Sequence, residues 1–174
     1  MVTDSEEIAQ TVKMLQNHGS KRKYDHEIEG LNSRLDALQA AMLRVKLRYL
    51  DRWNQKRKEI ASLYNILLED AKGVTRPKVR QESDHVFHLY VIRTKERDSL
   101  RENLERMGIS TGIHYPIPLH LQPAYDYLGI KQGAYPIAEM VAKEILSLPM
   151  YPELREKEVN VVTGEIKDFL KKCS

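Results

Sequence analysis

The chain has 174 residues, of which 30% are charged and 41% hydrophobic, a balance typical of globular domains and not of disordered segments. Its formal net charge of +3 gives little reason to expect a nucleic-acid partner. Its longest apolar runs fall far short of the ~20 residues that cross a bilayer, and its N-terminus lacks a secretory signal pattern, so we expect no membrane association. A single cysteine, Cys173, fits a reducing compartment, so we expect a cytoplasmic location.

The N-terminal part predicts a strand end, a helix and a loop. Residues 1–3 are interpreted as the tail of a strand. Asp4 and Glu7 have the spacing of a capping box, which opens a helix, and Gly19 is a natural helix stop. The segment 20–30 is charged and has no periodicity, so we expect a loop there.

A single long helix is predicted from Ser33 to about Leu68. Ser33 and Asp36 form a second start signal that resembles a capping box. Apolar residues then recur with a helical period at Leu35, Leu38, Met42, Val45, Tyr49, Trp53, Ile60, Leu63 and Leu67.

The C-terminal part alternates between strand and helix patterns. The expected elements are strands over 85–92 and 109–113 and helices over 94–107, 135–148 and 156–172. Two or more strands with helices on one face predict an α/β fold of the α+β layer type.

The segment between the second strand and the next helix is unusual in composition. Residues 112–129 read GIHYPIPLHLQPAYDYLG and contain three prolines, which fix φ and remove backbone donors. We therefore expect a stiff loop that ends in a short helical turn. Because it presents His114, Tyr115 and His120, it suits a polar ligand better than a hydrophobic core.

Four motifs resemble the DegT/DnrJ/EryC1/StrS family of pyridoxal-phosphate-dependent sugar aminotransferases. They are the loop 112–129, GLNSRLDALQAAML at 30–43, NHG at 17–19 and MVTD at 1–4. The resemblance covers nearly the whole chain, but only the C-terminal part of such an enzyme.

The resemblance implies a domain organisation typical of fold-type I aminotransferases. Residues 1–30 correspond to a remnant of the large cofactor-binding domain, residues 31–70 to a long connecting helix and residues 71–174 to the C-terminal small α/β domain. Since the first residues match a family strand inside the large domain, we expect the chain to be either an expressed piece of a longer enzyme or the product of a truncated reading frame.

The resemblance also assigns site residues. Asn32 matches the asparagine that reaches across a dimer interface to the phosphate of the neighbouring subunit's cofactor. Amide and guanidinium groups donate to phosphate, and imidazole and phenol groups hydrogen-bond sugar hydroxyls. The expected substrate-binding residues are Tyr24, Arg34, His114, Tyr115 and His120.

Each of these residues also has a purely structural interpretation. Asn32 is a good N-cap for the predicted long helix. Arg34 has a nearby Asp36, and Tyr24 follows a basic run at 21–23 that suits a solvated loop. The loop histidines could cap backbone carbonyls of the loop, and the tyrosine could pack with its hydroxyl hydrogen-bonded inside the protein. Both interpretations remain open at the level of sequence.

The implied reaction transfers an amino group from glutamate to a keto group on a nucleotide-linked sugar. The resemblance further implies that the full-length enzyme is a homodimer with pyridoxal 5′-phosphate as its cofactor. The lysine that carries the cofactor lies upstream in the family pattern, so no catalytic residue is assigned in this chain. The lysines present, such as Lys56 and Lys58, lie in charged contexts. We therefore expect the chain alone to be inactive.

Three alternatives compete with this interpretation. A sugar dehydratase of the same family carries histidine in place of the upstream lysine. A non-enzymatic domain would dimerise through the apolar residues Leu35, Leu38 and Met42. Nucleic-acid binding would use the basic residues at 21–23 and 44–58, but acidic residues are interleaved there.

A metal site is not expected. His85 and His88 would point to opposite faces of a strand, and neither this pair nor His114 with His120 has the further ligands that zinc needs. Cys173 is the single cysteine, so no internal disulfide is possible.

Overall fold

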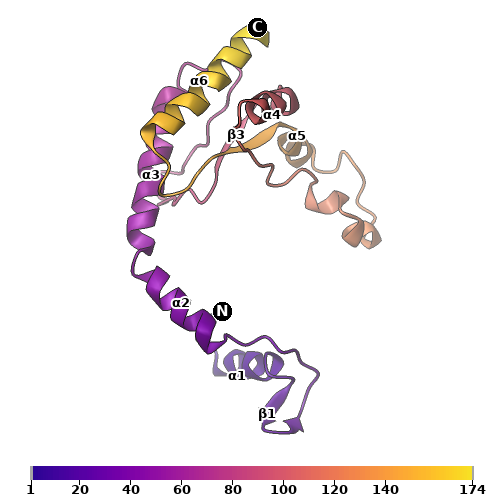
Figure 1. Cartoon of the computed structure of the whole chain (residues 1–174). Coiled ribbons are helices and arrows are strands. Elements are labelled where there is room, and N and C mark those ends of the chain that lie inside the picture. The colour runs from indigo at the N-terminus through magenta and orange to yellow at the C-terminus, as the bar shows by residue number, and fades with distance from the viewer. Residues whose placement is uncertain (1, 174) are drawn as a thin grey trace. The chain divides into compact units, whose positions relative to one another are not determined.

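The computed structural model describes residues 2–173 and divides between Tyr49 and Leu50 into two compact units (Figure 1). The first unit contains the helices α1 (Glu6–Leu15) and α2 (Ala37–Leu47) and the strands β1 (Ser20–Arg22) and β2 (Asp25–His26). No helix within residues 2–173 is long and apolar enough to cross a bilayer.

The start of the chain differs from the expectation in two ways. Residues 2 and 3 belong to no strand, and Met1 lies outside the described residues. The N-cap of α1 is Ser5 and not Asp4, because the Ser5 side chain accepts a hydrogen bond from the Ile8 N–H at 3.3 Å.

The segment predicted to be a loop at 20–30 contains the β1–β2 hairpin, so that prediction is wrong. Ser20 pairs with His26 and Arg22 with Asp25. These strands are mostly exposed and charged, so they lack the apolar alternation that identifies a half-buried strand in a sequence.

Gly19 holds the base of the hairpin. Its φ is +73°, and a Cβ there would collide with the Ile28 carbonyl group. The Gly19 carbonyl accepts a hydrogen bond from the Glu27 N–H at 2.9 Å. The glycine of the NHG motif is therefore needed for a close backbone approach.

The predicted long helix is interrupted at Arg48 and Tyr49, and it continues as α3 (Leu50–Leu67) in the second unit. The N–H groups of Arg48 and Tyr49 donate to carbonyls three residues earlier, at 3.2 and 3.0 Å, instead of four. No proline or glycine marks this position, and the apolar period runs through it, so the sequence pattern contains no sign of the break. The helix begins at Ala37, with Asp36 as its N-cap.

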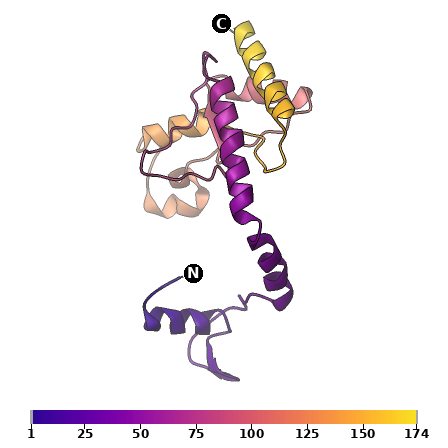
Figure 2. The ribbon, with the colours of Figure 1, turned by 90° about the vertical axis from the view of Figure 1, so that its left-hand side faces the viewer.

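The second unit is a layer of helices on a two-stranded antiparallel sheet. Its further elements are β3 (Tyr90–Arg93), α4 (Arg97–Arg106), the 3₁₀ turns η1 (Leu119–Leu121) and η2 (Pro123–Leu128), α5 (Pro136–Glu144), β4 (Ile145–Leu148) and α6 (Glu156–Cys173). In Figures 1 and 2, α6 runs beside α3, and it also contacts α4. This mixed layer has the α/β class that the sequence predicts.

Three predicted elements differ from those in the structure, and all three concern the sheet. The strand expected at 85–92 is confined to β3, and the one at 109–113 is reduced to a single bridge between Gly112 and Ser147. The helix expected at 135–148 ends at Glu144 and continues as β4, which pairs with β3. Residues 145–148 are buried, and a short apolar run of this kind is equally compatible with a helix.

The hydrophobic core of the second unit lies between its helices and its sheet. The rings of Tyr64 and Tyr90 stack with centroids 4.8 Å apart. Each hydroxyl donates a hydrogen bond, from Tyr64 to the Pro149 carbonyl at 3.0 Å and from Tyr90 to Asn65 Oδ1 at 2.6 Å. Burial raises the pKa of Tyr90 to about 12. Around them pack Leu68, Ile92, Leu100, Leu104, Leu146, Val159 and Ile166.

Candidate functional site

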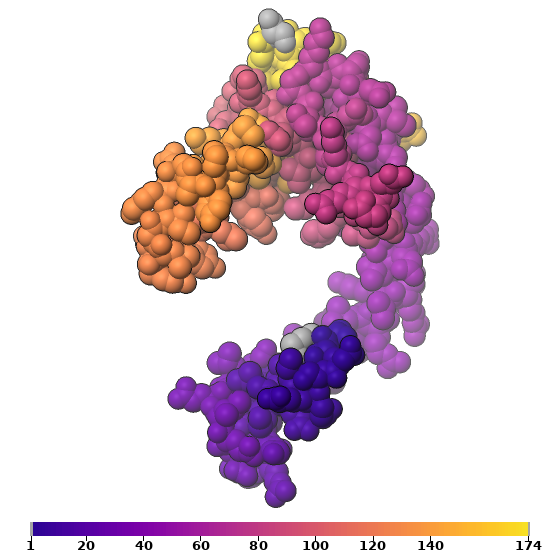
Figure 3. All heavy atoms as spheres, turned by 180° about the vertical axis from the view of Figure 1, so that it is seen from behind, coloured from indigo at the N-terminus to yellow at the C-terminus, as the bar shows by residue number. Residues whose placement is uncertain are grey.

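The proline-rich loop and α5 enclose an open pocket of about 800 Å³ in the second unit. The loop and the segment after it form the part of the unit that stands out in orange in Figure 3. Most of the pocket wall is apolar, and its polar and aromatic side chains are His114, Tyr115, His120, Gln122 and Tyr135. Three of the predicted substrate-binding residues therefore line one pocket.

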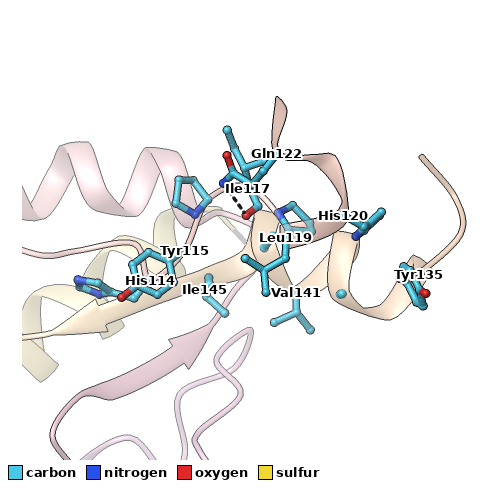
Figure 4. A pocket seen from close by; sticks show the side chains of 13 residues that line it. His114, Tyr115, Ile117, Leu119, His120, Gln122, Tyr135, Val141 and Ile145 are labelled. Atoms are coloured by element: carbon cyan, nitrogen blue, oxygen red, sulfur yellow. Dashed lines mark hydrogen bonds between the residues drawn. The ribbon is translucent and has the colours of Figure 1, made fainter. Parts of the chain in front are cut away.

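The three residues lie at different places along this pocket. Figure 4 shows His114 and Tyr115 near one end and His120 toward the other, where Tyr135 also lies. The side chain of Tyr115 is 74% exposed, so its hydroxyl is accessible to a ligand. The rings of His114 and Tyr115 make an edge contact, with centroids 5.6 Å apart.

The position of His114 is set by β4. Its Nδ1 lies 2.9 Å from the hydroxyl of Ser147, which is 33 residues away in sequence and buried. The backbone of Ser147 pairs with Gly112 through hydrogen bonds of 3.0 and 2.7 Å. A Cβ on Gly112 would lie 2.6 Å from His114 Cε1. The glycine and the serine together hold the imidazole ring in one place.

His120 is held by Glu139 of α5. Its Nε2 lies 3.0 Å from Glu139 Oε1, and the two side chains are only 9% and 11% exposed. The His120 ring also packs edge-on against Tyr135, with centroids 4.9 Å apart. One ring nitrogen of His120, Nε2, is therefore hydrogen-bonded within the protein.

Glu139 also accepts hydrogen bonds from the backbone. The Gly133 N–H lies 2.8 and 3.0 Å from its two oxygens, and the Tyr135 N–H lies 3.4 Å from Oε1. Burial alone would raise the pKa of Glu139, but the hydrogen bonds from His120, Gly133 and Tyr135 outweigh it and lower that pKa. The carboxylate is therefore ionised near neutral pH.

Asn32 and Arg34 lie together in the first unit. The backbone around Asn32 is fixed beside α1, because the Leu31 N–H donates to the Leu15 carbonyl at 2.7 Å and the Ser33 N–H to the Gln16 carbonyl at 2.9 Å. Arg34 Nε donates to Asn32 Oδ1 at 3.1 Å. The interpretation of Asn32 as the N-cap of the long helix is wrong, since Asp36 caps α2.

The Asn32–Arg34 contact leaves a set of donors that suits phosphate. Arg34 donates its hydrogen bond to the amide oxygen of Asn32, and the amide N–H₂ group remains a donor for a ligand. Both side chains are exposed. The Arg34 guanidinium adds further N–H groups and a positive charge. This chemistry fits the phosphate of a cofactor or a substrate.

Tyr24 lies in the turn of the β1–β2 hairpin with a φ of +67°. Its side chain is 83% exposed, and the Lys23 Nζ lies 5.0 Å from its ring centroid. The neighbour of its ring is thus a lysine of the same turn and not another predicted site residue, so its role in substrate binding stays a prediction.

The histidine pairs considered for a metal do not form a ligand cluster. Within residues 2–173 no group of three or more His, Cys, Asp or Glu side chains is arranged to hold a metal ion. His85 lies outside any strand, and its Nδ1 accepts a hydrogen bond from the Phe87 N–H at 2.9 Å.

Three residues that shape the pocket are not marked by any sequence pattern. Glu139 and Ser147 hold the two histidines, and Gly112 makes room for one of them. Glu139 and Ser147 are far from their partners in the chain and belong to a segment predicted as an ordinary helix. No short motif joins them to the histidines, so only their packing could identify them.

A model of the DegT/DnrJ/EryC1/StrS aminotransferase family matches residues 1–167. Among curated relatives, the erythromycin biosynthesis sensory transduction protein EryC1 of Saccharopolyspora erythraea is 46% identical over 167 residues. The dTDP-3-amino-3,4,6-trideoxy-α-D-glucose transaminase of Streptomyces venezuelae is 41% identical over 169 residues. These matches cover 96% and 97% of this chain, and it spans 46% and 45% of the length of those relatives.

Solved structures show the same similarity. The crystal structure of DesV from S. venezuelae superposes with a TM-score of 0.91 at 42% identity, over 97% of this chain and 45% of DesV. An aminotransferase from Brucella abortus superposes with a TM-score of 0.87 at 36% identity, over 96% of this chain and 44% of that protein.

Proposed function

Because the chain belongs to the DegT/DnrJ/EryC1/StrS aminotransferase family, we propose that it is the C-terminal part of a pyridoxal-phosphate-dependent aminotransferase acting on nucleotide-linked keto sugars. The observation that carries this proposal is the match to sugar transaminases over almost the whole chain. Residues 1–30 would belong to the large domain, 31–70 to the connecting helices and 71–174 to the small domain. Since the chain spans less than half of its relatives, the activity is proposed for the whole protein.

The Asn32–Arg34 pair is proposed to hold phosphate. Pyridoxal phosphate, when bound, supplies the electron sink that stabilises a substrate carbanion. Asn32 would donate its free amide N–H₂ to the phosphate of the neighbouring subunit's cofactor, while Arg34 keeps the amide oriented and contributes its charge to a substrate or cofactor phosphate.

Two of the pocket residues, His114 and Tyr115, are proposed to contact the nucleotide-sugar. His114 and Tyr115 would hydrogen-bond its hydroxyl or phosphate oxygens, since Ser147 fixes the first side chain and the second is exposed. Tyr24 would contribute its phenol from the hairpin turn. Glutamate as the amino donor and a cytoplasmic location are part of the same proposal.

The cofactor lysine is proposed to lie in another part of the whole protein. Every lysine within residues 2–173 is exposed or half-buried, so none has the desolvated surroundings that activate a Schiff-base lysine. We expect the 174-residue chain mixed with pyridoxal phosphate to transfer no amino group from glutamate, as measured by 2-oxoglutarate formation. Turnover that a lysine substitution within this chain abolishes would contradict the proposal.

A homodimer is supported by exposed apolar residues of the first unit. Leu35, Leu38 and Met42 are 64%, 73% and 53% exposed, which is costly for side chains left in water. In the whole protein Leu38→Asp should shift the mass measured by light scattering from dimer to monomer, whereas Glu102→Ala should not.

A mixed-dimer experiment tests the role of Asn32 across the interface. Whole protein with Asn32→Ala is mixed with whole protein whose cofactor lysine is replaced by alanine, and both are expected to be inactive alone. If Asn32 serves the neighbouring subunit, each mixed dimer regains one complete site, and subunit exchange should restore amino transfer. If the mixture stays inactive while wild-type subunits mixed with the lysine variant are active, Asn32 does not act across the interface.

A further inference from the structure

We propose that His120 and Glu139 form a positioning pair. Through its hydrogen bond to Glu139, His120 holds the wall of the substrate pocket in place, and it makes no hydrogen bond to the substrate. The inference deepens the proposed function and rests on it, since the pocket concerned is the one assigned to the nucleotide-sugar. Glu139 is not among the site residues expected from the sequence.

The Glu139 carboxylate is surrounded by hydrogen-bond donors. His120 Nε2, the Gly133 N–H and the Tyr135 N–H converge on its Oε1, and the Gly133 N–H also reaches Oε2. An ionised carboxylate can only accept, so the hydrogen bond requires the proton of His120 to reside on Nε2. Glu139 thereby assigns the tautomer of the neutral imidazole.

The carboxylate joins three separate segments. His120 belongs to η1 in the proline-rich loop, Gly133 to the connection after η2, and Tyr135 is the N-cap of α5. Glu139 itself lies in the first turn of α5, where the helix dipole favours a negative charge. One side chain therefore ties the loop that forms the pocket wall to the helix that forms its other side.

The side chains of His120 and Tyr115 differ in solvent exposure, which assigns them different roles in the pocket. The side chain of His120 is 9% exposed, with its Nε2 bonded to Glu139 and its ring against Tyr135. Tyr115 at the other end of the pocket is 74% exposed. A ligand in the pocket thus has access to the phenol of Tyr115, whereas the His120 side chain is mostly buried and its Nε2 is bonded to Glu139.

Substitutions at His120 distinguish positioning from substrate contact. Glutamine can place an amide N–H close to the position of the His120 Nε2, so His120→Gln keeps a donor for Glu139 but removes the imidazole. His120→Ala and Glu139→Ala remove the contact from either side. Glu102→Ala, which removes an exposed glutamate of α4, is the matched control.

The first measurement is amide hydrogen exchange in the 174-residue chain. His120→Ala and Glu139→Ala should each speed the exchange of backbone N–H groups in residues 117–122 and 133–135 by about tenfold or more, as expected from the loss of a hydrogen bond to a charged group. Exchange in α3 should not change. His120→Gln and Glu102→Ala should stay close to the unsubstituted chain.

The second measurement is steady-state amino transfer by the whole protein. Glu139→Ala and His120→Ala should raise KM for the nucleotide-sugar about tenfold with a smaller effect on kcat, and His120→Gln should recover most of the loss. The inference is overturned if His120→Gln is as impaired as His120→Ala while Glu139→Ala is unaffected, because the imidazole would then contact the substrate. It is also overturned if loop exchange does not respond to Glu139→Ala. Absence of amino transfer by the wild-type protein would instead refute the proposed function, and the exchange data would still decide the positioning role.

Discussion

Gly112 controls where a candidate substrate-binding side chain can lie. The ring of His114 occupies the space that a Cβ of residue 112 would need, and the backbone of Gly112 pairs with Ser147, whose hydroxyl meets the same ring. No positive φ is involved at Gly112. The need for glycine here comes from close packing beside a polar side chain, which is typical of a shaped site.

Gly112→Ala should displace the His114 ring and break its hydrogen bond to Ser147, because the new methyl group would lie 2.6 Å from Cε1. We expect the ring resonances of His114 to shift in NMR spectra of the 174-residue chain, in the direction seen with Ser147→Ala. A Cβ added to the helical glycine Gly164 would meet no atom within 4 Å, so Gly164→Ala should leave those resonances unchanged. An unchanged His114 ring in Gly112→Ala would contradict the argument.

Gly164 carries a prediction of its own at the level of the helix. It lies inside α6, its φ is not positive, and a Cβ there would meet open space. Gly164→Ala should therefore raise the free energy of unfolding by about 0.5–1 kcal/mol, since alanine loses less backbone entropy than glycine in a helix. Urea unfolding followed by circular dichroism measures the change, and a lower midpoint would contradict it.

The N-terminus of α6 should respond to acid. Glu158 accepts hydrogen bonds from the side chain of Arg155 and from its backbone N–H at 2.9 Å, and these contacts lower the pKa of Glu158 from 4.5 to about 2. A carboxyl group whose pKa is lower in the folded state stabilises the fold fully above pH 4.5, and this contribution is lost as the pH falls toward 2.

Glu158→Gln should reduce that pH dependence. Between about pH 7 and pH 5 the variant should be less stable than the unsubstituted chain, and the difference should shrink as the pH falls toward about 2. Thermal unfolding at a series of pH values measures this, with Glu102→Ala as the control. A difference that is constant with pH would show that Glu158 does not act through its charge.

At the scale of the whole molecule, the two units differ in how much they bury. The hydrophobic core between Ile60 and Leu170 belongs entirely to the second unit. Within residues 2–49 only Gly19 is buried. Since burial of apolar surface is the main favourable contribution to folding, the stability measured for this chain should come from the second unit.

A chain of residues 50–174 should therefore unfold cooperatively, with a midpoint close to that of the 174-residue chain. Differential scanning calorimetry of both chains tests this, and Leu104→Ala in either should lower stability by about 2–5 kcal/mol because Leu104 is fully buried. A non-cooperative transition for residues 50–174 would show that the first unit contributes to the core.

The sequence by itself determined the family, through its motifs, and the α/β class. It also determined most helices, because helical periods and capping residues act over a few neighbouring positions. It also located the proline-rich loop and placed His114, Tyr115 and His120 in it, and these three residues do line one pocket. The start signal of the connecting helix is displaced by three residues: the sequence pattern begins a capping box at Ser33 with Asp36 as its last residue, whereas in the structure Asp36 itself is the N-cap.

The tertiary structure alone decided the features that depend on distant partners. Residues 145–148 form a strand only because β3 is there to pair with them, and the hairpin at 20–26 depends on the close backbone approach at Gly19. The contacts of His114 with Ser147 and of His120 with Glu139 join residues 33 and 19 positions apart. Local propensity carries no information about such pairs, because their free energy arises only when packing brings the two side chains together.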